Sequence, residues 1–342
     1  MKKICQQIVV AFTISTGFVS GEVKMEAGAG WLSFTGGEGA GKGKHVVLLA
    51  GDEEYRSEES MPMLARILAE RHGFDTSVLF SANADGTINR GATGSLMGAE
   101  ALERADALVI LVRFRNWDDA TMERFKAAVG RGVPLIALRT STHLFNFPQE
   151  SPWAKWSWND GSGGFGKTVF GETWVSHWGD HKVEATRAVI EKGQEDNPVL
   201  NGVGEIFADS DVYEVAVPDD ATVLLRGLVL KGMGKHDEPV DRSKARKDGA
   251  EQKVNDPAMA VAWTRVVKNE EGTVNKVVTT TMGAATDLAD ESLRRLVVNG
   301  VYWGLGLEIP KAADVQFVGE FSPTKYGFED GQNGKKAVDF VK

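Results

Sequence analysis

The chain has 342 residues, of which 42% are hydrophobic and 25% charged, so it can bury a large core in one or two globular domains. Its net charge of −9 and its scattered basic residues argue against nucleic acid as the main partner, because phosphate neutralisation needs clustered lysine and arginine. The densest basic cluster, DRSKARKD (241–248), also carries acids and is predicted to be a solvated loop.

The first 21 residues have the pattern of a secretory signal peptide. Two lysines precede a short apolar run, and Val19 and Gly21 suit the cleavage positions. The run is too short and too interrupted to span a membrane. The single cysteine, Cys5, lies in this segment, so the processed chain would contain no disulfide, thiolate zinc site or cysteine nucleophile. We therefore predict a periplasmic or secreted protein without a membrane span; the alternative is a cytosolic protein whose translation begins at Met25.

Residues 22–44 are predicted to form a flexible leader rich in glycine and lysine. Its stretch GGEGAGKGK (36–44) resembles a phosphate-binding loop, but Gly43 stands where serine or threonine should bind magnesium, and the loop precedes a strand. A dinucleotide site is not indicated either, because GDEEYRS (51–57) replaces the glycine-rich turn expected after the first strand. The sequence therefore predicts no cofactor.

Strands and helices alternate from residue 45 onwards. Continuous apolar runs predict buried strands at 45–51, 74–80, 105–114 and 133–138, and helical spacing predicts helices at 57–73 and 118–129. This alternation is typical of a doubly wound, mostly parallel α/β sheet. The remaining chain is predicted to hold a tryptophan-rich loop at 151–181, strands at 182–190, 212–217, 222–230, 260–267 and 277–281, a polar insertion at 231–257, a helix at 290–303 and a surface tail at 311–342.

Polar residues follow three of the first four strands. Ligands bind beyond the carboxyl ends of strands in open α/β sheets, so we expect these residues to surround the site. They are Asp52, Glu53, Glu54, Tyr55 and Arg56 after the first strand, Arg113 and Arg115 after the third, and Arg139 and His143 after the fourth. We predict that Asp52, Glu53, Tyr55, Arg56 and Arg113 bind substrate, and that Arg139 pairs with Asp52 or Glu53 and orients the ligand. A purely structural ion pair is the alternative.

A second cluster lies in FGETWVSHWGDHK (170–182). Histidine titrates near neutrality, so His177 is predicted to be the acid–base residue, supported by Glu172 and His143. His177, Asp180 and His181 could instead bind a metal ion, although two histidines without an HExxH pattern are a weak metal signal. Trp174 and Trp178 could pack against sugar rings or fill the core.

Several ordered blocks between residues 45 and 310 resemble the ThuA-like (trehalose utilisation) family, especially its secreted bacterial branch. They include HVVLLAGDEEYRSEES, VRFRNW, ALRTSTH, FGETWVSHWGDH and MAVAWTRVV. The resemblance implies one ThuA-like domain with a flavodoxin-like, three-layer fold related to class I glutamine amidotransferases. Those enzymes carry a nucleophilic cysteine at the elbow after the fourth strand; Arg139 stands there in this chain, which excludes glutamine hydrolysis. Relatives tend to have Gly-Pro-Thr-Asp where this chain has residues 208–211, and two adjacent histidines at 177–178.

The family is linked to trehalose and related disaccharides, with 3-keto-glycosides as intermediates. The resemblance therefore implies an exported enzyme of carbohydrate metabolism that acts on a disaccharide, a glycoside or its 3-keto derivative by acid–base chemistry without a covalent nucleophile. The alternatives are a non-catalytic saccharide-binding protein and a divalent-metal hydrolase. The expected partner is a small saccharide, and a homo-oligomer is compatible with the sequence.

Overall fold

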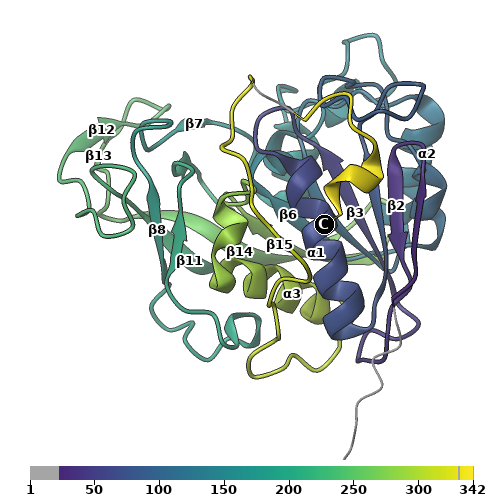
Figure 1. The fold of residues 1–342 in the computed structure, drawn as a ribbon. Helices are drawn as coiled ribbons and strands as arrows, with labels where there is room; N and C mark the ends of the chain where they lie inside the picture. Colours follow the sequence, from purple (N-terminus) through teal and green to yellow (C-terminus); the bar gives the residue numbers. More distant parts are fainter. Residues whose placement is uncertain (1–22, 330–331, 342) are drawn as a thin grey trace, which may run out of the picture.

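The structure is a computed structural model that describes residues 23–329 and 332–341; the predicted signal peptide lies outside these residues. Its main feature is a mixed sheet of eleven strands (Figure 1), in the order β1-β2-β4-β3-β5-β6-β15-β14-β11-β8-β9. These strands are β1 Met25–Gly28, β2 Trp31–Phe34, β3 His45–Gly51, β4 Asp75–Phe80, β5 Ala107–Val112, β6 Leu135–Leu138, β8 Thr186–Ile190, β9 Ile206–Ala208, β11 Thr222–Val229, β14 Met259–Lys268 and β15 Val274–Thr280.

The centre of the sheet consists of five parallel strands, β4-β3-β5-β6-β15. Their side chains alternate between two cores, as period-two geometry requires: Val46 and Leu48 of β3 face one core, while Val47 and Leu49 face the other. Helices α1 (Ser57–His72) and α3 (Glu291–Leu305) cover the first face and lie in front of the sheet in Figure 1. Helix α2 (Asp119–Gly130) covers the second face. The predicted α/β character and parallel core are therefore confirmed, whereas the outer strands pair antiparallel.

The predicted helix boundaries follow local signals. Asp118 caps α2 by accepting a hydrogen bond from the amide of Thr121 at 2.8 Å, and Asp290 caps α3 in the same way. Gly73, at φ 77°, ends α1 with backbone hydrogen bonds to the last turn.

The prediction that residues 22–44 form a flexible leader is partly wrong. Residues 25–34 form β1 and β2, and β2 pairs antiparallel with β4 along the edge of the sheet. Leu32 and Phe34 point into the core and are nearly fully buried. Pairing with β4 satisfies the backbone groups that this edge would otherwise expose, and the burial of two apolar side chains adds to the stability of the pairing.

Smaller elements complete the chain. Strands β7 (Ser176–His177) and β10 (Tyr213–Glu214) pair with each other, as do β12 (Ser243–Ala245) and β13 (Glu251–Lys253) of the polar insertion. The short helical segments are η1 Ala99–Arg104, η2 Arg139–His143, η3 Ala154–Trp156, η4 Gly166–Phe170, η5 Pro198–Leu200, η6 Asp287–Ala289 and η7 Ala337–Phe340. The described tail runs along α1 (yellow in Figure 1) and buries Tyr326. None of the described helices is long and apolar enough to cross a membrane.

Candidate functional site

Backbone strain marks one edge of the sheet. Among the described residues, four other than glycine have positive φ: Arg56 (59°), Phe114 (52°), Arg139 (41°) and Lys182 (61°). The first three follow the carboxyl ends of β3, β5 and β6, and Lys182 follows His181 in sequence. Such conformations cost on the order of 1–3 kcal/mol each and gather at functional sites. The strain therefore supports the location predicted from strand ends.

The elbow after β6 presents a buried arginine. Arg139 is 0% exposed, and its guanidinium lies between the rings of Tyr55 and Tyr213, at 4.5 and 4.1 Å from their centroids. Its Nη2 donates to Oδ1 of Asp211 at 2.8 Å, and its Nη1 donates to the carbonyl oxygens of Asp211 (2.7 Å) and Thr281 (2.8 Å). Arg139 is therefore a fixed internal cation that supports its neighbours and does not face a ligand.

Asp211 is the centre of the site. Besides Arg139, its carboxylate accepts a hydrogen bond from Nδ1 of His177 at 2.7 Å and from Nδ1 of His181 at 2.8 Å. Burial alone would raise the pKa of Asp211, but the charge of Arg139 and the two histidine hydrogen bonds outweigh burial and hold it below its usual range. Asp211 is thus an anion that orients both imidazole rings.

His181 lies between two carboxylates. Its Nδ1 contacts Asp211, and its Nε2 contacts Oε1 of Glu54 at 3.0 Å. Both ring nitrogens therefore donate, which only the doubly protonated imidazolium can do. Burial lowers its pKa, but the hydrogen bonds to Asp211 and Glu54 prevail and raise it to about 9.

This raised pKa predicts how stability depends on pH. The folded state favours the charged form of His181, so its stabilisation is complete below pH 6.5 and is lost as pH rises through about 9. The contribution is at most about 3 kcal/mol, and solvent screening of the partly exposed ring reduces it. Urea unfolding across this pH range should show the decline in the native chain and a flatter profile in His181→Gln. Equal slopes for the two proteins would contradict this assignment.

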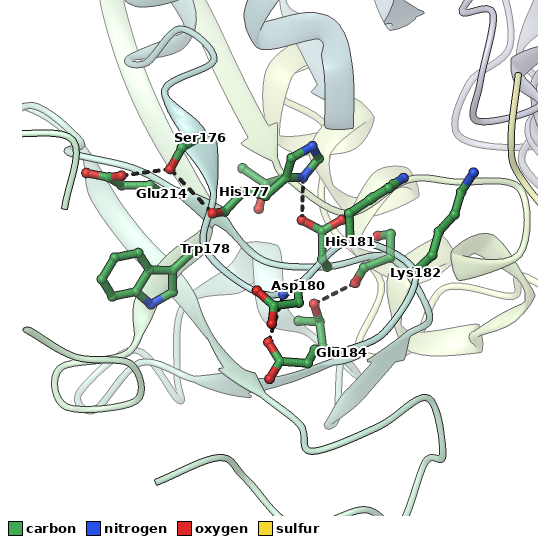
Figure 2. A network of polar contacts seen from close by, with 12 residues as sticks. Ser176, His177, Trp178, Asp180, His181, Lys182, Glu184 and Glu214 are labelled. Atoms are coloured by element: carbon green, nitrogen blue, oxygen red, sulfur yellow. Dashed lines mark hydrogen bonds and ion pairs between the residues drawn. The ribbon is translucent and has the colours of Figure 1, made fainter. Parts of the chain in front are cut away.

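His177 is the accessible member of the histidine pair. Its side chain is 37% exposed, and its ring lies 4.7 Å from the ring of His181 between centroids. Because Nδ1 donates to Asp211, the neutral ring carries its lone pair on Nε2, which has no hydrogen-bond partner among the described residues. Figure 2 shows that the chain runs from His177, at the end of β7, into a turn that carries His181 and Lys182. The amide of Asp180 donates to Oε2 of Glu184 at 2.7 Å and closes this turn; we call residues 176–184 the histidine loop. The arrangement resembles a general base oriented by a buried carboxylate.

The acids after β3 and the arginines after β5 pair with each other. Glu53 contacts Nε of Arg113 at 2.9 Å and Nη2 of Arg115 at 2.7 Å, while Oε2 of Glu54 accepts from Nη1 of Arg113 at 3.0 Å. Arg115 is fully buried, whereas Arg113 is partly exposed. Glu53 (25% exposed) and Arg113 (11% exposed) are therefore the members of this network that a ligand could reach.

A row of half-buried aromatic rings leads to His177. Trp174 lies 5.7 Å from His177, Trp158 lies 6.1 Å from Trp174, and Phe114 lies 5.4 Å from Trp158, all between ring centroids. Arg113 stands 5.4 Å from the centroid of Phe114. We call Phe114, Trp158 and Trp174 the aromatic wall.

Several hollows lie outside the histidine pair, and two of them differ in their relation to it. One, of about 510 Å³, adjoins it through Lys182 and Tyr326. The other, of about 270 Å³, is lined by Trp156, Phe165 and the start of β15 near Asn275. The elbow contacts the opposite end of β15, so the second hollow takes no part in this site.

Comparisons with known proteins give only distant similarities. No protein-family model matches the chain, and no curated protein matches its sequence. A solved structure named as a ThuA-like protein from Parabacteroides merdae shares 12% identity and a TM-score of 0.48 over 79% of this chain and 92% of that one. Another of that name from Bacteroides uniformis shares 13% identity and a TM-score of 0.42 over 76% and 90%.

Both carry the family name to which the sequence blocks point. A protein from Thermoplasma acidophilum that is named as part of a GMP synthase shares 12% identity and a TM-score of 0.38, over 75% of this chain and 92% of that one. All three TM-scores are below 0.5, so the ThuA-like and GMP synthase names say nothing of the chemistry of this chain.

Several predicted roles are wrong for residues around the elbow. Arg139 pairs with Asp211, not with Asp52 or Glu53. The carboxylate of Asp52 is buried and accepts from the amides of Glu54 and Tyr55 and from the hydroxyl of Thr140, so it holds the turn. Tyr55 is buried against Arg139, and Arg56 donates to the carbonyl oxygens of Gly327 and Glu329 in the tail. Glu53 is engaged by two arginines. Asp52 and Tyr55 are fully buried, whereas substrate binding by Glu53 and Arg56 stays a prediction, because Glu53 is 25% exposed and Arg56 lines the hollow of about 510 Å³.

The predictions for the second cluster also need correction. Glu172 accepts hydrogen bonds from the amides of Thr173 and Ala216 at 2.9 Å each and does not support His177. His143 is 3% exposed, and burial with the charges of Arg113 and Arg139 lowers its pKa well below the usual value, so it is neutral and inaccessible. Trp178 is fully buried. Trp174, in contrast, is half-buried and lies beside His177, and its binding of a sugar stays a prediction.

Sequence reasoning missed Asp211, although one signal pointed to it. Asp211 occupies the position of the aspartate in the Gly-Pro-Thr-Asp of the family's relatives, while the three residues before it differ. Its partner Arg139 is 72 positions away in sequence, so no local pattern connects the two.

The ligand atoms of His177, His181 and Asp211 lie within 4.8 Å of one another, a spacing that could hold a metal ion. Asp180, the predicted third ligand, is exposed and instead lies 3.6 Å from Arg242. In the present geometry both Nδ1 atoms donate to Asp211, and Arg139 already neutralises this carboxylate at 2.8 Å. The guanidinium charge of Arg139 would repel a divalent ion bound at Asp211, so the site favours hydrogen bonds from the arginine and the two histidines over metal binding.

Proposed function

We propose that the chain is an acid–base enzyme that removes a proton beside a carbonyl group, with His177 as the base. The observation that carries the proposal is the hydrogen bond from Nδ1 of His177 to the buried carboxylate of Asp211, which leaves Nε2 free on the accessible side. A base held in one tautomer by a buried carboxylate typically accelerates proton transfer by about 10²–10⁴-fold.

The surrounding charges suit the enolate that such a reaction forms. His181 is an imidazolium beside the base, and Nη2 of Arg113 has no hydrogen-bond partner among the described residues. In the reaction, Nε2 of His177 takes the proton, the C–H electron pair forms a C=C bond, and the carbonyl π pair moves to oxygen. For elimination, the oxygen pair re-forms the C=O bond, the enolate C=C pair forms a new double bond to the β-carbon, and the C–O bond there breaks with its pair on the departing alcohol oxygen, which takes the proton from Nε2. For isomerisation, the proton returns to a carbon of the enolate and the C=O bond re-forms. No covalent nucleophile is needed.

The substrate class is proposed to be an oxidised sugar, such as a 3-keto-glycoside of a disaccharide. The family resemblance in the sequence and the aromatic wall support this class, because flat rings pack against the apolar faces of pyranoses. Arg113 at one end of the wall could bind sugar hydroxyls. Export to the periplasm or medium belongs to the same proposal and rests on residues 1–21 of the sequence alone.

A proton NMR time course in D₂O tests the proposal. A 3-keto-glucoside is incubated with the protein, and its 3-hydroxy parent serves as the control substrate. We expect deuterium to enter beside the carbonyl, or the glycoside to be cleaved, and His177→Gln to lose at least about a hundredfold in rate.

Other outcomes would replace the proposal. Line broadening of the sugar without any exchange or product would indicate a saccharide-binding protein. Turnover that is abolished by chelation and restored by a divalent ion would indicate a metal hydrolase at His177, His181 and Asp211.

A further inference from the structure

The basic cluster DRSKARKD is not the solvated loop that the sequence predicted. Its residues 243–245 form β12, and the burial of its side chains alternates with period two. Arg242, Lys244 and Arg246 are half-buried, while the residues between them are exposed. The three cations therefore share one face of the strand, which we call the β12 cationic face.

This face contacts the histidine loop on both sides of His177. After the histidine, Nη2 of Arg242 donates to Glu184 at 2.6 Å. Before the histidine, the hydroxyl of Ser176 donates to Glu214 of β10 at 2.8 Å. Glu214 is in turn held by the cluster, because it lies 3.7 Å from Arg246 and accepts from the amide of Lys247 at 2.9 Å. Figure 2 shows Ser176 and Glu214 in contact next to His177.

Lys244 binds the loop at the histidine itself. Its Nζ donates to the carbonyl oxygen of His177 at 3.1 Å and to that of Trp178 at 3.0 Å. Trp178 is fully buried, and its Nε1 donates to the carbonyl oxygen of Val254 at 2.9 Å, within the same insertion. The peptide group that joins His177 to Trp178 is therefore held from two directions.

We propose that the β12 cationic face is a clamp that orients His177 toward Asp211, with Lys244 as the positioning residue for the base. Lys244 donates hydrogen bonds to two backbone carbonyl oxygens of the loop and also lies 3.7 Å from Oδ1 of Asp180 and 6.0 Å from the centroid of the Trp178 ring. All these contacts are with the loop itself, so Lys244 acts through His177. The effect on turnover rests on the proposed function, whereas the orientation of the imidazole rings can be measured without any substrate.

The first test is proton NMR of the imidazole N–H groups in Lys244→Met. In the native protein, the Nδ1 protons of His177 and His181 should give downfield signals, because both are held against Asp211; His177→Gln and His181→Gln assign them. We expect Lys244→Met to lose or broaden the His177 signal. Lys235→Met is the matched control, since Lys235 lies in the same insertion, is exposed, and its side chain has no hydrogen bond among the described residues.

The second test measures whether the pKa of His181 rises or falls in Lys244→Met. Its ring faces Asp211, Glu54, Tyr55, Tyr326 and His177. Removing the positive charge of Lys244 by itself would leave the pKa of His181 unchanged or raise it. Loosening the loop would weaken the hydrogen bonds to Asp211 and Glu54 and lower the pKa from about 9 toward 6.5. A fall of about one unit or more supports the clamp; a rise, or no change together with an intact His177 signal, overturns it.

Kinetics with the 3-keto-glucoside complete the test if that probe is turned over. We expect kcat to fall about tenfold or more with KM within about twofold, and Lys244→Arg to restore most of the loss because it can still donate to both carbonyls. If Lys244→Met does not fold, Lys244→Gln allows the same spectra. A failure of turnover in the native protein would sink the proposed function but leave the NMR result on the clamp standing.

Discussion

Replacing Asp211 with asparagine is expected to abolish most of the activity and also to lower stability, because the buried charge of Arg139 loses its partner. The amide can still fill the space, but it cannot carry the charge that both Nδ1 protons now meet at 2.7 and 2.8 Å. The proton of His177 can then move to Nε2, which removes the lone pair that acts as the base. In catalytic triads the same exchange lowers kcat by about 10⁴, and we expect a loss of at least about a thousandfold here.

The same substitution should also change the charge of His181. Without the carboxylate, its pKa is expected to fall from about 9 toward the ordinary value of 6.5, which NMR titration measures directly. Asp219→Asn, an exposed aspartate of the same segment, is the matched control and should change neither quantity. Activity within about tenfold of the native chain in Asp211→Asn would reject the role of Asp211 in holding the base.

Arg139→Met is expected to cause the largest loss of stability. Asp211 is 1% exposed and pairs with the guanidinium of Arg139, which is itself fully buried and stacked between two tyrosine rings and keeps its charge at every ordinary pH. Removing one partner of a buried ion pair leaves the other charge uncompensated and costs about 3–5 kcal/mol. Chemical denaturation should show this loss.

An exposed ion pair provides the comparison for Arg139. Arg124 pairs with Glu103 at 2.9 Å on the surface, so Arg124→Met should change the free energy of unfolding by no more than about 1 kcal/mol. A similarly small loss in Arg139→Met would mean that the two histidines alone keep Asp211 charged, and the central role assigned to the arginine would then have to be abandoned.

The parts of the fold that depend on local patterns could be predicted from the sequence. The apolar runs that became β3, β5 and β6 and the caps at Asp118 and Asp290 are determined by neighbouring residues, since a strand or a cap needs only a few adjacent positions. The rule that ligands meet strand ends placed Glu53, Arg113 and Arg139 at one edge of the sheet, where the structure brings them together. His177 was predicted from its own sequence cluster, and its side chain is accessible.

Tertiary structure alone decided how those residues pair. The start of the glycine-rich leader forms strands because β2 pairs with the edge of β4. The cluster DRSKARKD is ordered because Lys244 donates to a carbonyl oxygen of the histidine loop. Trp174 and Trp178 are four positions apart and of the same type, yet one is half-exposed beside His177 and the other is in the core. Asp211 meets Arg139 across 72 positions. In each case the deciding partner comes from a distant segment, and the strength of a charge or a hydrogen bond depends on that partner and on burial, neither of which is encoded in local spacing.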